Sequence, residues 1–161
     1  MSANRQIGIL IFDGVEELDF VGPYEVFTMS NEVHGREGRE HPDTVTLISE
    51  RGRPVTGAKG MRVEAHASLE STHKLDLLLV PGGIGTRREV ENERLLGWIA
   101  KMAEDTEWIT SVCTGALLLC AAGPGRGKRV TPIGPLSIRS ANAARCRKSS
   151  KTFAMPATAI S

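Results

Sequence analysis

The residue best suited to chemistry is a cysteine that stands between a strand-like segment and a helix-like segment. Residues 108–112 are mostly apolar and short enough for a strand, and residues 115–122 are rich in alanine and leucine. No loop separates them, so the backbone must turn from extended to helical at Cys113, with Ser111 and Gly115 leaving room for the turn. This small–x–Cys–x–small pattern is typical of a nucleophile elbow.

A cysteine in such an elbow would act as a nucleophile. The N-terminus of the following helix presents unpaired N–H groups and the positive end of the helix dipole, and both favour the reactive thiolate. The other interpretation is a buried, inert cysteine at the end of a strand, which is the usual environment of a free cysteine. The small residues on both sides favour the nucleophile.

Two other segments supply groups that would assist this cysteine. Asp19 follows the apolar run 7–12, and the glycine turn 82–85 follows the apolar run 75–80. The carboxyl ends of parallel strands meet at one edge of an open α/β sheet, where ligands bind. We therefore expect all three segments to converge. Asp19 would exchange a proton during the reaction, and N–H groups of the turn and of Thr114 would receive developing negative charge.

Each assisting group also has a purely structural interpretation. Asp19 alone could cap the start of a helix, and the turn 82–85 alone could be a tight turn without any role in anion binding. The turn is not a dinucleotide-binding motif, because the G-x-G-x-x-G spacing is absent. If Asp19 acts as an acid, burial beside the thiolate must raise its pKa.

The elements that must position these groups alternate along the chain. Apolar runs and helical spacing predict strands over 7–12, 44–49, 75–80 and 108–112, helices from Pro23 onward, over 89–103 and after Cys113, a loop over 31–42, and a short hairpin over 55–66. This order predicts an α/β protein with an open, mostly parallel sheet sandwiched by helices.

Composition and charge narrow the possible partners and compartments. A net charge of +1 gives no electrostatic basis for binding nucleic acid or an anionic membrane surface. The apolar runs are too short to span a bilayer, and we recognise no secretory signal at the N-terminus. Three cysteines argue against a disulfide framework, and Cys113 and Cys120 lie roughly 11 Å apart along one helix, too far to bridge. We therefore expect a cytoplasmic protein.

The four histidines do not form a pattern typical of a metal site. His34 and His41 fall in a polar segment, and none of the four has the spacing to a cysteine or carboxylate that zinc requires. We expect neither a metal nor a cofactor. We expect the pair Arg87-Arg88 to be a solvated helix start, with binding of an anionic substrate as the alternative.

Three motifs, in this order along the chain, resemble the ThiJ/PfpI superfamily. They are FDGVEELDFVGP at 12–23, VPGGIGT at 80–86 and SVCTGA at 111–116. The resemblance implies the superfamily's flavodoxin-like fold, which is related to class I glutamine amidotransferases. Within the superfamily, the sequence is most similar to the isonitrile hydratase branch.

The resemblance also implies a role for each matching residue. Cys113 corresponds to the nucleophile, Asp19 to its acidic partner and Thr114 to their polar neighbour. The glycine turn beside the site would consist of Gly82, Gly83 and Ile84. The implied reaction adds water to a small-molecule isonitrile and gives an N-substituted formamide, without a cofactor, and intact relatives are expected to be homodimers.

Two alternatives to this enzyme remain open. Protease-like and chaperone-like branches often have histidine after the nucleophile, where this chain has Thr114, which disfavours a Cys–His hydrolase. The Cys-Thr-Gly pattern also occurs in the amidase-like domains of AraC-type transcription regulators. Those proteins continue into a helix-turn-helix region, which we do not expect here. A ligand-sensing or stress-related protein without catalysis is therefore the second interpretation.

The sequence departs from the superfamily after Thr131. Relatives continue with T-H-W-A and further helices and strands, whereas residues 132–161 lead into a Ser-, Ala-, Arg- and Lys-rich segment without periodicity. If Pro132, Ile133 and Gly134 are written as CCC-ATT-GGG, which the genetic code permits, reading from the last base of the Pro132 codon gives His-Trp, so a frameshift would explain the change. We expect an incomplete ThiJ/PfpI-type domain over 1–131, an aberrant, disordered tail over 132–161, and impaired activity.

Overall fold

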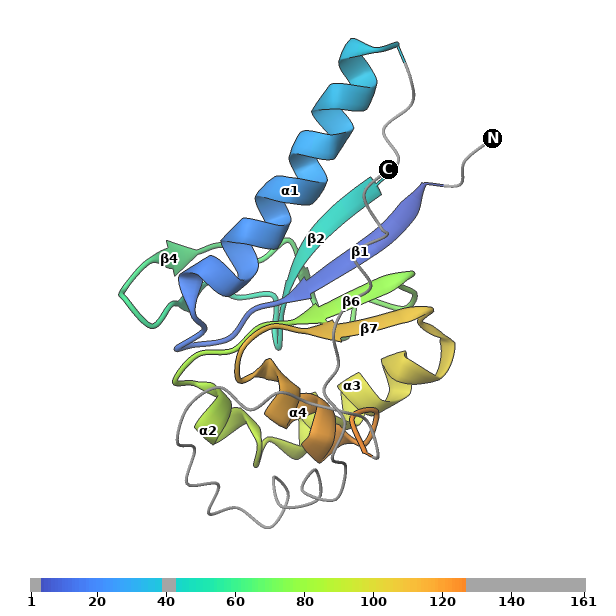
Figure 1. Ribbon diagram of the computed structural model, residues 1–161. Coiled ribbons are helices and arrows are strands. Elements are labelled where there is room, and N and C mark those ends of the chain that lie inside the picture. Colours follow the sequence, from blue (N-terminus) through green and yellow to red (C-terminus); the bar gives the residue numbers. More distant parts are fainter. Residues whose placement is uncertain (1–3, 39–42, 127–161) are drawn as a thin grey trace.

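A computed structural model of the protein describes residues 4–38 and 43–126. Its main feature is a five-stranded sheet in the order β5-β2-β1-β6-β7 (Figure 1). All neighbouring strands run parallel, which confirms the predicted parallel sheet. The strands are β1 (Arg5–Leu10), β2 (Asp43–Ser49), β5 (Ala67–Ser68), β6 (Leu77–Val80) and β7 (Trp108–Ser111).

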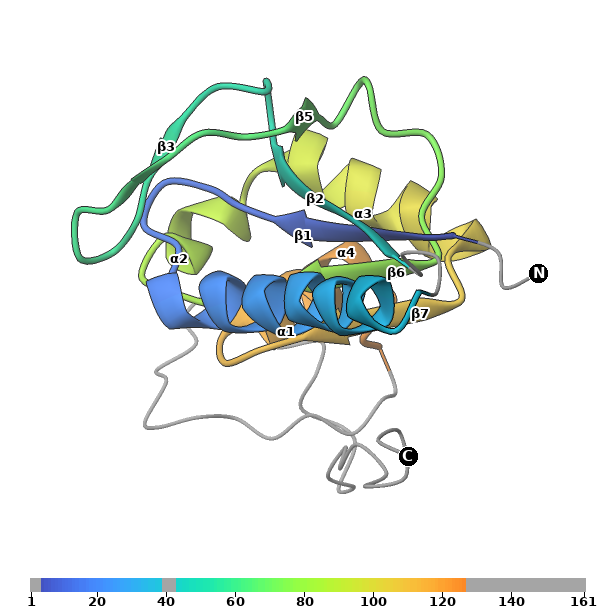
Figure 2. The same ribbon diagram turned by 90° about the horizontal axis from the view of Figure 1, so that it is seen from above.

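Helices cover both faces of this sheet. Figures 1 and 2 show α1 (Glu17–Arg36) alone on one face and α2 (Thr86–Glu89), α3 (Glu93–Asp105) and α4 (Gly115–Ala122) on the other. Side chains of β1 such as Ile9 and Leu10 are fully buried, as expected for a parallel strand that is covered on both faces. None of the described helices combines the length and apolar character that crossing a membrane requires.

Helix α1 is longer than predicted at both ends. It begins at Glu17, so Pro23 lies inside the helix and not in its first turn. Proline has no N–H, and the helical bond to the carbonyl of Asp19 is therefore missing. The helix nevertheless continues because Phe20 is buried and Tyr24 packs against the core. Burial of this apolar face outweighs the unfavourable proline.

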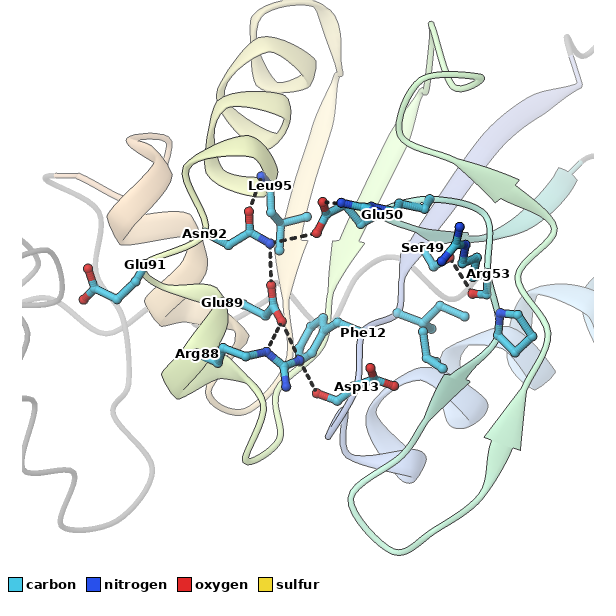
Figure 3. A pocket seen from close by; sticks show the side chains of 14 residues that line it. Phe12, Asp13, Ser49, Glu50, Arg53, Arg88, Glu89, Glu91, Asn92 and Leu95 are labelled. Atoms are coloured by element: carbon cyan, nitrogen blue, oxygen red, sulfur yellow. Dashed lines mark hydrogen bonds and ion pairs between the residues drawn. The ribbon is translucent and has the colours of Figure 1, made fainter.

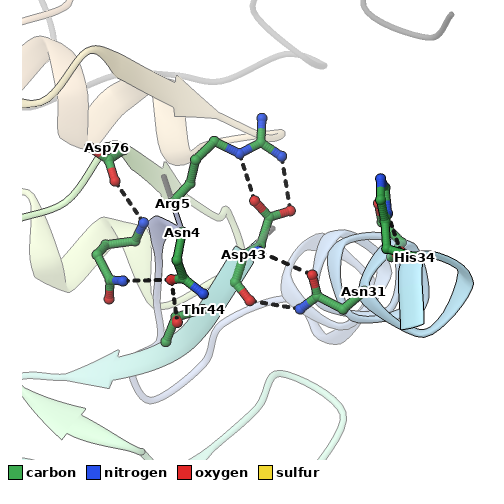
Figure 4. Close-up of polar contacts among 9 residues, drawn as sticks. Asn4, Arg5, Asn31, His34, Asp43, Thr44 and Asp76 are labelled. Carbon is green, nitrogen blue, oxygen red and sulfur yellow. Dashed lines mark hydrogen bonds and ion pairs between the residues drawn. The ribbon is translucent and has the colours of Figure 1, made fainter. Parts of the chain in front are cut away.

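The predicted loop at 31–42 is wrong for residues 31–36, which form the last turns of α1. Tertiary hydrogen bonds explain the difference (Figure 4). The Asn31 side chain donates to the Asp43 carbonyl at 2.7 Å and accepts from the Asp43 N–H at 3.1 Å. The buried Asp43 carboxylate in turn forms an ion pair with Arg5 at 2.6 Å. These contacts fix a polar helix end to the sheet, which the local sequence pattern does not reveal.

The smaller elements match the predictions in part. The hairpin is confirmed as β3 (Val55–Thr56) and β4 (Arg62–Val63), which pair antiparallel. Strand β5 has only two residues and was not predicted. The helix predicted over 89–103 is α3, which starts at Glu93 because Asn92 caps it by accepting from the Leu95 N–H at 3.2 Å, and the short helix α2 before it was not predicted.

The outer face of α1 is unusually apolar. Its exposed apolar side chains recur along the helix and are Leu18, Val21, Val26, Met29 and Val33. They point away from the buried face that Phe20 marks, and they lie exposed among the described residues.

Substitutions on the two faces of α1 should therefore differ in cost. Val26 is 67% exposed, so Val26→Lys should change the free energy of unfolding by no more than about 0.5 kcal/mol. Phe20→Ala should lower it by about 3–5 kcal/mol, because it leaves a cavity in the core. Urea denaturation of both variants measures the difference. A large loss in Val26→Lys would show that the outer face is covered in solution.

Candidate active site

Cys113 occupies a strained turn between β7 and α4. Its φ angle is 53°, and among residues 4–38 and 43–126 it is the only non-glycine residue with a positive φ. Such a backbone conformation is costly for a residue with a side chain and is often found at functional sites. The predicted change from strand to helix at this residue is confirmed, and the thiol is partly exposed, in contrast to an inert core cysteine.

Gly115 allows this turn to pack closely against the sheet. A Cβ atom at this position would lie 2.0 Å from the Val80 carbonyl oxygen. The start of α4 can therefore lie on the carboxyl end of β6 only because residue 115 has no side chain. The second small residue of the elbow pattern thus has a direct steric reason.

Asp19 faces the elbow and does not cap its own helix. Its Oδ2 atom accepts a hydrogen bond from the Gly82 N–H at 3.0 Å, and the carboxyl group also interacts with the Cys113 thiol. The N-cap of α1 is Glu16, and no side chain caps that helix end. The structure therefore brings Asp19 and Cys113 together.

The environment of Asp19 raises its pKa above the ordinary value. Burial is the largest cause, and the negative charge of Glu16 adds to it. The Gly82 N–H and the Cys113 thiol act in the opposite direction, because they stabilise the carboxylate. Asp19 therefore holds a proton more readily than an exposed aspartate does, as a general acid must.

The glycine turn packs between the first turn of α1, which carries Asp19, and the elbow that carries Cys113. Gly83 has a φ of 123°, and an added Cβ atom would lie 2.3 Å from the Gly14 carbonyl oxygen. At Gly82, an added Cβ atom would lie 2.6 Å from the Thr114 nitrogen. Ile84 lies on the outside of the turn, with 64% of its surface exposed. Glycines are required here because backbone and site side chains fill the space.

The N–H groups of Gly82 and Gly83 already have partners. Gly82 donates to Asp19, and Gly83 donates to the Thr114 hydroxyl at 3.0 Å. In this structure the turn therefore orients the two side chains that flank the cysteine. Stabilisation of developing negative charge by the same N–H groups stays a prediction.

Sequence reasoning missed one residue of this cluster, Thr86 at the start of α2. It is 1% exposed, and its hydroxyl donates to the Gly83 carbonyl at 2.7 Å and lies 3.2 Å from the Thr114 hydroxyl oxygen. The available signal was its position, as the first polar side chain after the glycine turn.

A cavity of about 580 Å³ lies between α2, the segment that follows β1 and the segment that follows β2 (Figure 3). Neither Cys113 nor Asp19 lines it. At its edge, buried Glu89 accepts hydrogen bonds from Arg88 at 2.6 Å and from Asn92 at 2.8 Å. Arg88 also donates to the Asp13 carbonyl. Arg88 is thus a structural partner at the start of α2, although most of its side chain is exposed as predicted.

The structure describes some of the remaining cysteines and histidines that the sequence analysis discussed, and others lie outside the described residues. Cys120 is fully buried on α4, as expected. His34 and His66 both hydrogen-bond backbone groups, and no cluster of potential metal ligands is present in the part of the chain that the structure describes. Cys146 and the predicted boundary at 131, with the segment 132–161, lie outside the described residues.

The fold and the site together define a class of protein. It is a parallel α/β protein whose strand order reverses between β1 and β6, and its cysteine elbow follows the neighbouring strand β7. The chain belongs to the DJ-1/PfpI family, whose model matches residues 5–145. This range extends past residue 131, where we predicted that the domain ends.

Individual relatives agree with this assignment. Isonitrile hydratase from Pseudomonas putida is 37% identical over 126 residues, which cover 78% of this chain and 51% of the relative. The transcriptional regulator CdhR from Pseudomonas aeruginosa is 30% identical over 128 residues, which cover 80% and 36%. A solved ThiJ/PfpI family protein from Pseudomonas syringae is 28% identical with a TM-score of 0.65 over 75% of this chain and 47% of its own. The chain thus spans about half the length of the hydratase and of that solved protein.

The raised pKa of Asp19 predicts how Asp19→Asn changes stability with pH. Because the native state resists ionisation of this group, its contribution to stability is largest below the unfolded pKa and decreases as pH rises through the native value. Asparagine removes this effect while its amide oxygen still accepts from Gly82. The melting temperature of Asp19→Asn relative to the wild type should therefore rise between about pH 3 and pH 8.

Thermal melts followed by circular dichroism measure this trend. Glu104→Gln, which removes an exposed carboxylate from α3, is the matched control and should show no comparable rise. A relative melting temperature of Asp19→Asn that falls toward neutral pH would contradict the burial of Asp19 as a poorly ionised group.

Proposed function

We propose that this chain is an isonitrile hydratase-type enzyme that converts a small-molecule isonitrile and water into an N-substituted formamide. The observation that supports the proposal is the pairing of a strained, partly exposed cysteine with an acid whose pKa is raised. The relationship to the Pseudomonas putida isonitrile hydratase supports this choice of reaction.

The first step uses the thiolate and the acid in turn. The Cys113 sulfur donates an electron pair to the terminal carbon of R–N≡C, and a C–S bond forms as the carbon–nitrogen triple bond becomes a double bond. Asp19 delivers its proton to the same carbon, which gives the thioimidate R–N=CH–S–Cys113. A partly buried acid whose pKa is raised suits this step.

The second step uses Asp19 in the opposite direction. The carboxylate takes a proton from water as the water oxygen attacks the thioimidate carbon, and passes this proton to the nitrogen. It then takes the remaining hydroxyl proton as the adduct collapses. Collapse of the tetrahedral adduct breaks the C–S bond, releases R–NH–CHO and returns the thiolate. One water is consumed, no electron acceptor is needed, and Asp19 ends with the proton that it lost.

A Cys–His hydrolase fits this site less well. The residue after the nucleophile is Thr114, and its hydroxyl is held by the Gly83 N–H. No imidazole occupies the position that follows the cysteine, so proton transfer falls to Asp19. We also propose a cytoplasmic location, since a reducing compartment keeps Cys113 as a thiol.

A second candidate function follows from the match to the regulator CdhR, of which this chain covers 36%. A related domain inside a transcription regulator favours ligand sensing without turnover. The two functions differ in one observable, because a sensor binds its ligand reversibly and releases it unchanged. Mass analysis of the ligand after incubation therefore distinguishes them.

The elbow predicts that Cys113 is the most reactive thiol of the chain. Limiting iodoacetamide should modify Cys113 before Cys120, which is fully buried, and labelling should persist at about pH 6. Peptide mapping by mass spectrometry measures the order. Asp19→Asn should change the pH dependence of the labelling, because the two groups interact. Earlier labelling of Cys146 at pH 6 would contradict the elbow argument.

The proposed reaction predicts both a product and an adduct. Excess aryl isonitrile should give the matching N-aryl formamide by liquid chromatography, and a quenched sample should carry one isonitrile on Cys113. Cys113→Ser should lower formamide formation by at least about 10³-fold, and Asp19→Asn by at least about 10²-fold. Thr28→Val, which changes a side chain of α1 that makes no contact with the site, is the control and should retain turnover. The proposal would be refuted if the wild type formed no more formamide and no more adduct than Cys113→Ser.

A further inference from the structure

We infer that Thr86 is a positioning residue, whose buried hydroxyl group sets the orientation of the Thr114 side chain beside Cys113. Thr86 is the last residue of the VPGGIGT motif, but the resemblance to hydratases gives it no role. The inference rests on the proposed function for its effect on turnover, but its geometric part stands independently of the reaction.

The evidence is a small hydrogen-bond network of two hydroxyl groups and the N–H and C=O groups of Gly83. The Thr86 hydroxyl donates to the Gly83 carbonyl at 2.7 Å. The N–H of the same residue, Gly83, donates to the Thr114 hydroxyl oxygen at 3.0 Å. The two hydroxyl oxygens lie 3.2 Å apart. Thr86 therefore fixes one residue of the glycine turn, and that residue fixes Thr114.

Counting hydrogen atoms shows what Thr86 does for Thr114. The shortest contact to the Gly83 carbonyl uses the hydrogen of Thr86. The 3.2 Å contact between the two hydroxyl oxygens has Thr86 as the donor, and Thr114 itself donates only at 3.3 Å, to the same carbonyl. Because this longer contact is weak, the Thr114 hydroxyl can donate elsewhere. Without Thr86, the carbonyl would compete for this hydrogen.

The direction in which Thr114 can act follows from its position relative to Gly82. The Thr114 hydroxyl oxygen and the Asp19 Oδ2 atom lie 2.7 Å and 2.9 Å from the point where a Cβ atom of Gly82 would stand. The two side chains therefore lie close together beside Gly82, next to the elbow. In the proposed reaction, Thr114 would donate to the nitrogen of the bound isonitrile while Asp19 protonates the carbon.

Amide hydrogen exchange of Gly83, followed by NMR, tests the geometric part. Thr86→Val keeps the shape of the side chain but removes the hydroxyl, and should speed exchange of the Gly83 amide by about tenfold or more as Thr114 leaves its position. Thr86→Ser should restore slow exchange. Thr28→Val is the matched control, since it removes a 2.8 Å hydroxyl-to-carbonyl bond within α1. Unchanged Gly83 exchange in Thr86→Val would overturn the inference.

A double-mutant cycle on formamide production tests the effect on turnover. Thr86→Val should lower kcat/KM by about tenfold in the wild-type background but by less than about twofold in Thr114→Val, because Thr86 acts through Thr114. Equal losses in both backgrounds would show a structural role only. If the wild type makes no formamide, the proposed function fails, while the exchange of Gly83 still decides whether Thr86 positions Thr114.

Discussion

The hydrogen bond from the Gly82 N–H to the Asp19 carboxyl group joins the two halves of this molecule. Asp19 belongs to the unit of β1 and α1, and Gly82 follows β6, 63 positions further along the chain. Because an added side chain at Gly82 would collide with both Asp19 and Thr114, the bond forms only with glycine. This hydrogen bond holds the Asp19 carboxyl group beside Cys113.

The same contact sets the chemical character of the site. Burial raises the pKa of Asp19, while the Gly82 N–H limits that rise. A carboxyl group held in this way can both give and take a proton, which the two proposed steps require. This arrangement lowers the stability of the native state when Asp19 is ionised, because the ionised group is less favourable there than in the unfolded chain.

Sequence alone predicted which residues come together at the candidate site, but not the residues that hold them in place. The apolar runs and the pattern around Cys113 were enough to predict the parallel sheet, the elbow and the convergence of Asp19 with the glycine turn, because each depends on local periodicity or on glycine sterics. The extent of α1 was missed because the Asn31–Asp43 hydrogen bonds come from distant segments. Thr86 was missed because a buried threonine has no distinguishing local pattern.

Pro23 gives the first turn of α1 a dependence that the rest of the helix does not share. Proline cannot donate to the Asp19 carbonyl. The hydrogen bonds within α1 therefore hold Asp19 less firmly than its neighbours. Its anchor is the distant Gly82. During synthesis and folding, the acid and the thiol therefore meet only after β6 has joined β1. A chain whose sheet has not yet assembled therefore carries an ordinary cysteine. Cys113 gains its acidic partner only in the folded state.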